Sequence, residues 1–245
     1  MVNQVSLKPG VLFVQTFSGG TLMDVAGDRF IALTPLSAAL WSGAAAGQDA
    51  DGLVRTIARQ TSATADAARA LLGRQLDAWE RAGLVNPRER PSALPTPRPE
   101  PLAPPREWPA AEARRFRASP LVMARLFAAE RQYRYAVASE GLASALVRLQ
   151  RETHPAAPDP HAITLRTVRA YQAVRRAFRQ GRTATDCLFR SLALAAVLRR
   201  RGVSADLCIG IVDVPFAAHA WVESGGVVLN ESLARRLEFV TIGRF

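Results

Sequence analysis

The sequence predicts an α+β protein in two domains, and three observations support this fold class. Within the first 86 residues, three short β-prone runs are followed by three helical segments. Residues 87–109 then hold nine of the 16 prolines of the chain. Beyond this segment, long helical stretches precede a series of β-rich runs. We therefore expect an N-terminal domain, a linker and a larger C-terminal domain over residues 1–86, 87–109 and 110–245.

The N-terminal domain is expected to begin with a small sheet. The three β-prone runs are separated by turns rich in Gly, Ser and Asp, and they cover Val11–Gln15, Thr21–Asp24 and Arg29–Leu33. Three strands followed by helices in so short a segment predict a compact, winged-helix-like unit.

The helices of this domain carry recognisable start signals. Thr34 is suited to cap a helix that has Pro35 at its first position. A second helix is expected around Leu53–Ala58, and Thr64 caps a third. The third helix has an apolar face at spacings of four, four and three residues, formed by Ala68, Leu72, Leu76 and Trp79.

The proline-rich segment 87–109 is predicted to be a linker. Proline fixes φ and lacks an amide donor, so such a run fits neither a helix interior nor the centre of a sheet. An extended, semi-rigid spacer is the expected conformation. The alternative is a docking ligand for a proline-reading domain.

The C-terminal domain is predicted to begin with helices and to end with strands. Helices are expected over residues 121–150, with a break near Gly141, and over residues 163–178. A third helix begins at Asp186 and ends at Gly202. The β-rich runs that follow cover residues 205–212, 219–223 and 227–230.

Composition excludes several classes of protein. Apolar residues make up 49% and charged residues 22%, which excludes wholesale disorder. No apolar run approaches the ~18–20 residues of a membrane-spanning helix, and the N-terminus lacks the pattern of a signal peptide. Two cysteines exclude a disulfide scaffold and favour a reducing compartment, so we expect a cytoplasmic protein.

The net charge of +11 is confined to the C-terminal part. Residues 1–86 are neutral, residues 87–109 carry +1 and residues 110–245 carry +10. Arginine supplies 31 of the 32 basic residues, which is typical of codon bias, and the arginines are scattered along helices. Solvated helix faces are therefore the preferred interpretation, and nucleic acid is not expected as a partner. A non-enzymatic peptide- or DNA-binding adaptor is the alternative.

One cysteine is placed where a thiol becomes reactive. Asp186 is a natural N-cap, which leaves Cys187 in the first turn of its helix, where the helix dipole lowers a thiol pKa. His219 opens a following β-run, and Glu231 comes directly after the next one. Nucleophile, base and orienting acid in this order are the layout of a papain-like site. Cys208 lies inside an apolar β-run and is predicted to be core.

No metal or cofactor is expected. His154 and His161 lie in a proline-rich segment and do not have the spacing of metal ligands. The two cysteines and His219 are then the only sulfur or imidazole groups left as candidate ligands.

The segment that follows Cys187 resembles the leader peptidases of lasso-peptide biosynthesis, the B proteins. The resemblance rests on CLFRSLAL at residues 187–194, LRRRG at 198–202 and IGI at 209–211. It extends to PFAAHAWVE at residues 215–223 and VLN at 228–230. Residues 1–86 resemble the PqqD-like precursor-recognition domain that many such proteases carry.

The resemblance implies a function and partners. The C-terminal domain would be a transglutaminase-like cysteine protease, and the N-terminal domain would bind the leader of a ribosomally made precursor peptide. An asparagine-synthetase-like cyclase would then form the macrolactam, and any dependence on ATP would come through this partner. The leader would add as a strand beside the third strand, against the third helix. In this chain the implied peptide-binding residues are Phe30, Ile31, Ala32, Leu33, Leu72, Gln75 and Leu76.

The sequence departs from the family at one catalytic position. The family has an aspartate after the hairpin, where this chain has Glu231 preceded by Asn230. Glutamate and asparagine both occur as orienting residues, so Asn230 is the alternative to Glu231. The backbone amide of Cys187 is expected to stabilise an oxyanion. A transglutaminase or acyltransferase would use the same residues, and it remains the alternative activity.

Overall fold

The computed structural model describes residues 5–85, 95, 97–98, 104–108, 116–152, 156–157, 159–177 and 186–245, with the backbone alone for 175–177. The chain divides into two compact units, Met1–Leu94 and Pro95–Phe245, here called the N-terminal and the C-terminal unit. The architecture is mixed α and β, as the sequence predicts.

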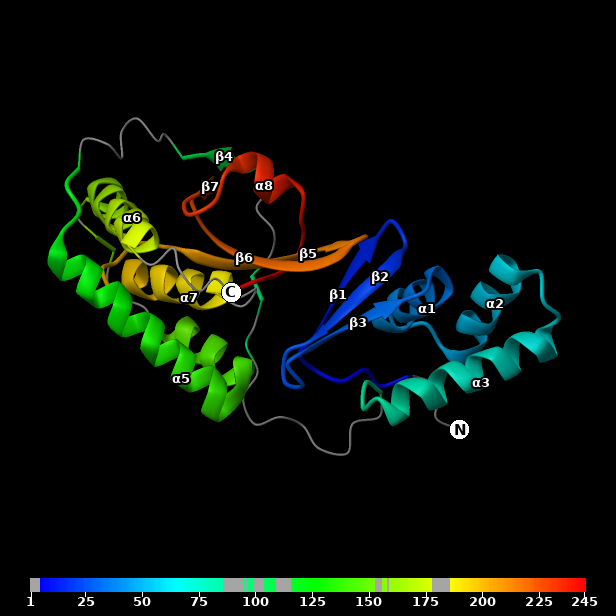
Figure 1. Cartoon of the computed structure of the whole chain (residues 1–245). Helices are drawn as coiled ribbons and strands as arrows, with labels where there is room; N and C mark the ends of the chain where they lie inside the picture. The colour runs from blue at the N-terminus through cyan, green and yellow to red at the C-terminus, as the bar shows by residue number, and fades with distance from the viewer. Residues whose placement is uncertain are drawn as a thin grey trace. The chain divides into compact units, whose positions relative to one another are not determined.

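The N-terminal unit is a three-stranded antiparallel meander followed by three helices (Figure 1). The strands occur in the order β1-β2-β3 in sequence and in space, so β2 is central. The elements are β1 (Val11–Thr16), β2 (Gly19–Asp24), β3 (Arg29–Leu33), α1 (Pro35–Ala45), α2 (Ala50–Thr61) and α3 (Ala65–Arg81). All six agree with the elements predicted from the sequence.

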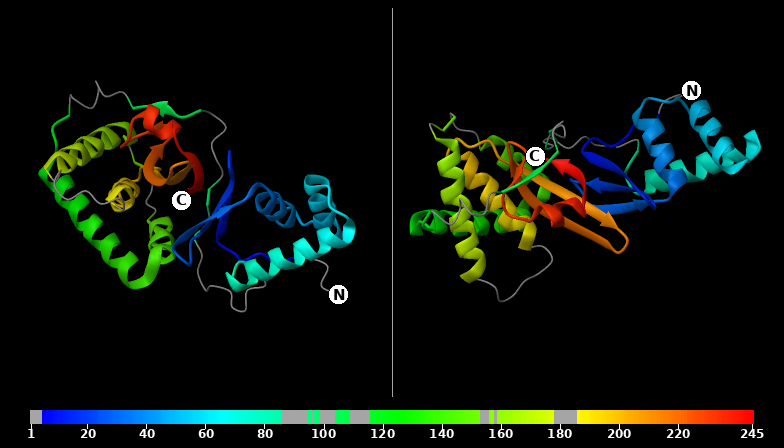
Figure 2. Two further views of the ribbon diagram at one scale, coloured as in Figure 1. Left: turned by 45° about the vertical axis from the view of Figure 1, so that its right-hand side comes forward. Right: turned by 90° about the horizontal axis from the view of Figure 1, so that it is seen from above.

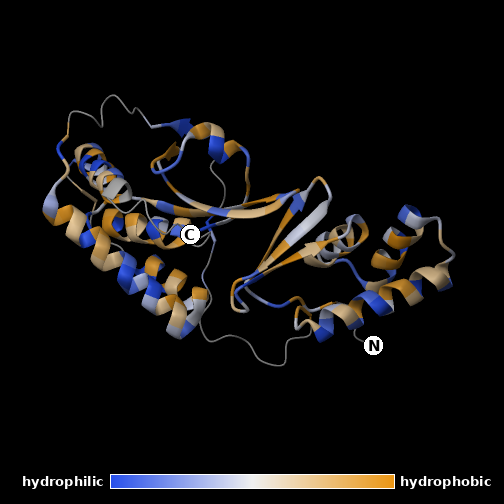
Figure 3. Cartoon of the chain, in the orientation of Figure 1, coloured by the Kyte–Doolittle hydropathy of each residue, from blue (hydrophilic) through white to orange (hydrophobic). Residues whose placement is uncertain are grey.

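The predicted helix caps are present. The Thr34 side chain accepts a hydrogen bond from the Ser37 backbone amide at 3.2 Å. Thr64 caps α3 in the same way, and α3 shows both polar and apolar residues along its length (Figure 3). Because capping satisfies amides that a helix cannot bond internally, these residues set where α1 and α3 begin.

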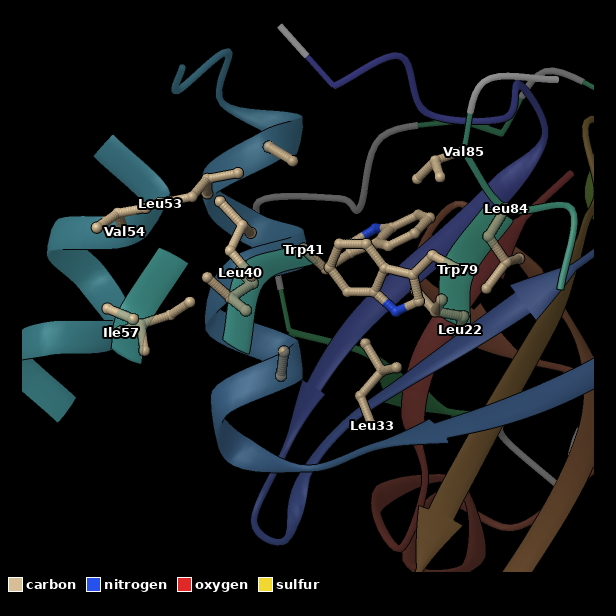
Figure 4. Packing of buried hydrophobic residues seen from close by; sticks show 14 residues of the cluster. Leu22, Leu33, Leu40, Trp41, Leu53, Val54, Ile57, Trp79, Leu84 and Val85 are labelled. Carbon is tan, nitrogen blue, oxygen red and sulfur yellow. The ribbon is translucent and has the colours of Figure 1, made fainter. Parts of the chain in front are cut away.

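An apolar core of its own holds the N-terminal unit together. Trp41 of α1 and Trp79 of α3 meet edge to face, with ring centroids 5.2 Å apart (Figure 4). Leu22 and Leu33 from the sheet belong to the same buried cluster. Beyond α3, Val85 returns to this core and pairs with Leu7.

Long helices precede the β5–β6 hairpin of the C-terminal unit. Helix α5 (Pro120–Arg151) has the predicted break at Gly141, whose φ is 83°. It is followed by α6 (Pro160–Ala177) and α7 (Asp186–Arg199). Helix α7 is buried from Ser191 to Arg199, since it packs against α5, α6 and the sheet (Figure 2).

In the residues that the structure describes, the sheet has five strands in the order β4-β7-β6-β5-β8. Its longest pair is the antiparallel hairpin of β5 and β6, in which Gly210 lies opposite His219. The remaining elements are short. The bounds are β4 (Arg106–Glu107), β5 (Asp206–Asp213), β6 (Phe216–Ser224), β7 (Val227–Val228), α8 (Leu233–Leu237) and β8 (Val240–Arg244).

The structure corrects the extent of the predicted linker. Strand β4 lies inside residues 87–109 and pairs in parallel with β7, so this part of the segment belongs to the sheet of the C-terminal unit. Its position at the edge of the sheet suits a proline-rich segment. The division between units falls at Pro95 rather than at residue 110. Residues 87–94, 96, 99–103 and 109 of the predicted linker lie outside the described residues.

Among the helices that the structure describes, none is long and apolar enough to cross a membrane.

Candidate active site

Cys187 is the second residue of α7 and therefore lies in the first turn, as predicted. The described part of α7 begins at Asp186. The thiol accepts hydrogen bonds from the backbone amides of Leu188 and Ala220. These donors, together with the positive end of the helix, stabilise negative charge on the sulfur.

The thiol of Cys187 is hydrogen-bonded to the imidazole of His219. Burial by itself raises the pKa of Cys187, but the hydrogen bond from His219 and the two backbone amides outweigh it and lower the pKa below its ordinary value. Burial lowers the pKa of His219, yet Cys187 and Glu231 outweigh it and raise this pKa to about 9. The pair therefore favours a thiolate beside an imidazolium.

Glu231 holds the other side of the imidazole. Its Oε2 lies 3.0 Å from Nε2 of His219, and both side chains are largely buried. Because Nε2 bonds to the carboxylate, Nδ1 is the nitrogen left to face Cys187. Cysteine, histidine and glutamate are thus brought together in the predicted order.

Aromatic side chains support the imidazole. The ring of Trp221 stacks with His219 at 6.3 Å between centroids, and that of Phe239 lies at 5.2 Å. Gly210 makes room for this packing, because a Cβ there would come within 2.7 Å of the Trp221 ring. These contacts limit the orientations that the imidazole can adopt.

Among the described residues, only part of the β6 edge beside the site is paired with another strand. The short strand β7 pairs only with Glu223 and Ser224. Further along β6, the Val222 carbonyl accepts a hydrogen bond from Leu229, and the Ala220 carbonyl accepts one from Ser191 of α7. The start of α7 can therefore approach His219 from the strand edge.

Asn230 makes other contacts than those expected of an orienting residue. Its Oδ1 accepts from the Val222 backbone amide at 2.7 Å, and its Nδ2 donates to Ser191 Oγ at 2.9 Å. Since Nε2 of His219 bonds to Glu231, the geometry favours Glu231 over Asn230 as the residue that orients the imidazole.

A charged cluster surrounds the residue before the nucleophile. The buried carboxylate of Asp186 accepts a hydrogen bond from Arg134 at 2.6 Å, and Arg190 lies 3.7 Å away. Arg134 also lies over the ring of Phe189. The positive charge of Arg190 is therefore offset by Asp186, and it does not act on Cys187 as an isolated charge.

The other cysteine has the environment of a core residue. Cys208 is fully buried in β5, and burial raises the pKa of its thiol above the ordinary value. Within the described ranges, no group of three or more His, Cys, Asp or Glu side chains is arranged to hold a metal ion.

The expected peptide-binding residues separate into two groups. Ile31, Leu33, Leu72 and Leu76 join one hydrophobic cluster of the N-terminal unit, while Gln75 contacts Ser37 of α1. Phe30 and Ala32 alternate with Ile31 and Leu33 along β3, so they point to the opposite face of the sheet. In the described residues β3 is an edge strand, which is the feature that strand addition requires.

Ser191 is a site residue that the sequence did not single out. It is fully buried, and its hydroxyl bonds to both β6 and Asn230. The signal available in the sequence was a hydroxyl directly before the apolar segment at residues 192–198, a position where a polar group needs a specific partner.

The C-terminal unit contains a transglutaminase-like region. Residues 127–244, which include all three candidate catalytic residues, match the sequence profile of the Transglutaminase-like superfamily. No solved structure matches the chain.

A curated relative narrows the similarity further. Over 48 residues the chain is 46% identical to the Microcin J25-processing protein McjB of Escherichia coli, a lasso-peptide biosynthesis B protein. The match covers 20% of this chain and 23% of that relative. It confirms the predicted resemblance to the B proteins and supports a role in lasso-peptide biosynthesis.

Proposed function

We propose that this chain is a cysteine endopeptidase that binds the leader of a lasso-precursor peptide and cleaves it off, so that a partner cyclase can form the macrolactam. The observation that carries the proposal is the hydrogen-bonded series Cys187–His219–Glu231 at the start of α7. The similarity to a protein named for processing microcin J25 supports the choice of substrate.

The chemistry follows from the assigned roles. The Cys187 thiolate attacks the scissile carbonyl carbon, and the carbonyl π electrons move to oxygen. When the tetrahedral intermediate collapses, the C–N bond breaks and the His219 imidazolium gives its proton to the leaving amine. His219 then takes a proton from water, which attacks the thioester and releases Cys187. Glu231 accepts the hydrogen bond of the other ring nitrogen throughout and keeps the imidazole oriented.

Leader capture is assigned to the N-terminal unit. The edge of β3 offers backbone groups to which an extended leader can add as a fourth strand. Apolar leader side chains on one face would meet Ile31 and Leu76, both of which are partly buried against the core. Residues 1–94 would thus bind the substrate, while Cys187 cuts it.

The proposal predicts that Cys187→Ala abolishes cleavage but leaves leader binding intact, because the nucleophile and the binding strand lie in different units. The substrate for the test is the peptide encoded by a short reading frame beside the gene. Mass spectrometry follows its cleavage, and fluorescence anisotropy of a labelled leader gives the Kd. The matched control is Cys208→Ala, which removes the unreactive thiol of the core. This variant is expected to cleave the precursor at a rate close to that of the wild type.

Two results would count against the proposal. Cleavage by Cys187→Ala at the wild-type rate would remove Cys187 from the nucleophile role. Products that carry an added amine in place of water would assign the site to acyl transfer, the activity that transglutaminases perform with the same groups.

A further inference from the structure

The buried hydroxyl of Ser191 joins two elements of the active site. It lies on α7 one turn after Cys187, and it is fully buried. Its Oγ donates to the Ala220 carbonyl at 3.0 Å and accepts from Asn230 Nδ2 at 2.9 Å. A hydroxyl has one proton to donate, so these two bonds fix its orientation.

Asn230 extends the connection to a third element. It follows β7, and its Oδ1 accepts a hydrogen bond from the Val222 backbone amide at 2.7 Å. The side chain therefore bridges α7 and β6 at the part of the β6 edge that β7 leaves uncovered. In the described part of the sheet, the bonds of Ser191 and Asn230 hold β6 where β7 does not pair with it.

Each residue of this connection is close in sequence to a candidate catalytic residue. Ser191 follows Cys187 by four positions, Ala220 follows His219, and Asn230 precedes Glu231. The backbone amide of Ala220 also donates a hydrogen bond to the Cys187 sulfur. A shift of Ser191 or Asn230 would therefore change the spacing between thiol, imidazole and carboxylate.

The bonds of Ser191 differ from those of other buried hydroxyls in the same unit. Thr164 and Thr167 of α6 donate to the carbonyls of Pro160 and Ile163, four residues earlier in their own helix. Ser191 instead donates to a strand 29 residues away. The first arrangement is local to one helix, whereas the second fixes a helix against a strand.

We propose that Ser191 and Asn230 are positioning residues that hold Cys187, His219 and Glu231 in register by hydrogen-bonding α7, β6 and the segment after β7 to one another. The inference rests on the proposed function, because that function gives Cys187, His219 and Glu231 their catalytic roles. Its test uses the reactivity of the thiol, which can be measured without any peptide substrate.

The experiment compares Ser191→Ala and Asn230→Ala with the wild-type full-length chain. Iodoacetamide is the probe, and mass spectrometry assigns alkylation to Cys187 as a function of pH. Wild-type Cys187 is expected to react as a thiolate well below the ordinary cysteine pKa. In both variants the midpoint of the profile is expected to rise by about one pH unit or more, because the sulfur and the imidazole are no longer held together. With the precursor, kcat should fall about 10–100-fold while KM stays unchanged.

Thr164→Val is the matched control, since it removes a buried hydroxyl of the same unit without touching the site. It is expected to keep the wild-type alkylation profile, even where its thermal stability falls as much as that of Ser191→Ala. If Ser191→Ala does not fold, Asn230→Ala decides, because Asn230 is only partly buried. Wild-type alkylation profiles in the folded variants would overturn the proposal.

The readouts separate this proposal from the proposed function. A wild-type chain that alkylates as a thiolate but does not cut the precursor contradicts the peptidase assignment alone. A chain that cuts the precursor, with variants that keep the wild-type thiol profile and kcat, contradicts only the positioning role.

Discussion

At the scale of single residues, the chemistry of the site depends on the proton that Cys187 and His219 share. The pKa of Cys187 lies below its ordinary value and that of His219 lies at about 9. Between these values the thiol has lost its proton and the imidazole has kept it, so the reactive ion pair exists over that pH range. Above it the imidazole can no longer protonate a leaving amine. Activity should therefore fall as the pH rises through about 9.

The carboxylate of Glu231 is expected to set the upper end of this range. Cys187 and Glu231 together raise the pKa of His219, and Glu231→Gln removes the second of these contributions. The alkaline limb of kcat/KM should therefore move to lower pH by about one unit. Turnover should also fall, because the imidazole loses its orienting acceptor. The pH profile of precursor cleavage measures both effects.

Glu231→Asp serves as the control for that substitution, because it keeps the charge and restores the residue of the related family. It should retain an alkaline limb near that of the wild type. An unchanged limb in Glu231→Gln would show that the carboxylate does not act on the imidazole, and would return the orienting role to Asn230.

The candidate catalytic residues could be predicted, whereas their supporting residues could not. Cys187 at a helix start and His219 on a strand have signals that depend on nearby sequence. The choice between Asn230 and Glu231 depends on which side chain reaches Nε2, and adjacent residues on one segment point in different directions. Ser191 was missed because its partners, Ala220 and Asn230, are distant in sequence.

At the scale of elements, a buried ionic cluster joins the last two elements of the chain to β6. Glu223 of β6 is fully buried and accepts hydrogen bonds from Trp221, Arg236 of α8 and Arg244 of β8. Burial raises the pKa of Glu223, but these three donors outweigh it and keep the pKa below its ordinary value. The ionised carboxylate thus fixes α8 and β8 against the hairpin.

Glu223→Gln should destabilise the chain by about 3 kcal/mol, because it removes the buried negative charge that Arg236 and Arg244 share, and Arg244 then keeps only its ion pair with Asp206. Urea unfolding at neutral pH measures the loss. Since the pKa of Glu223 is lowered by folding, its contribution is present above the ordinary pKa of 4.5 and is lost as the pH falls through the folded-state value. The difference between variant and wild type should therefore shrink in acid.

Glu238→Gln is the matched control for the ionic cluster. Glu238 pairs with Arg235 on the surface, where both side chains are about half exposed. An exposed pair of this kind contributes about 0–1 kcal/mol. Equal losses in the free energy of unfolding of the two variants would show that the buried Glu223 cluster contributes no more than an exposed ion pair.

The elements that the sequence predicts are those with signals of their own. Helices α1 and α3 have a threonine cap and an apolar face, and the kink of α5 has its glycine. Elements α8, β8 and β4 are five residues or fewer, and they form because a neighbour pairs with them or bonds to them. For β4 the proline content pointed to a linker, since composition does not show which two residues will pair at a sheet edge.

At the scale of the whole molecule, the chain places the open edge of β3 and the candidate catalytic residues in different units. The N-terminal unit has its own buried core, centred on Trp41 and Trp79, and its own sheet. The candidate catalytic residues all lie in the C-terminal unit. In the proposed function, binding by the first unit raises the concentration of the scissile bond near the second. The two activities should therefore be separable by cutting the chain between Leu94 and Pro95.

Residues 1–94 alone are expected to bind the leader with a Kd close to that of the full chain, because the binding strand and its supporting core are both included. Residues 95–245 alone should cleave the precursor with a KM raised about 100-fold or more and a kcat near that of the full chain, since the nucleophile is intact but the effective concentration is lost. A short peptide that spans the cleavage site without the leader is the matched control, and both forms should cut it at the same slow rate. Equal binding of residues 1–94 to a scrambled leader would contradict specific capture, and an unchanged KM for residues 95–245 would assign leader recognition to the C-terminal unit.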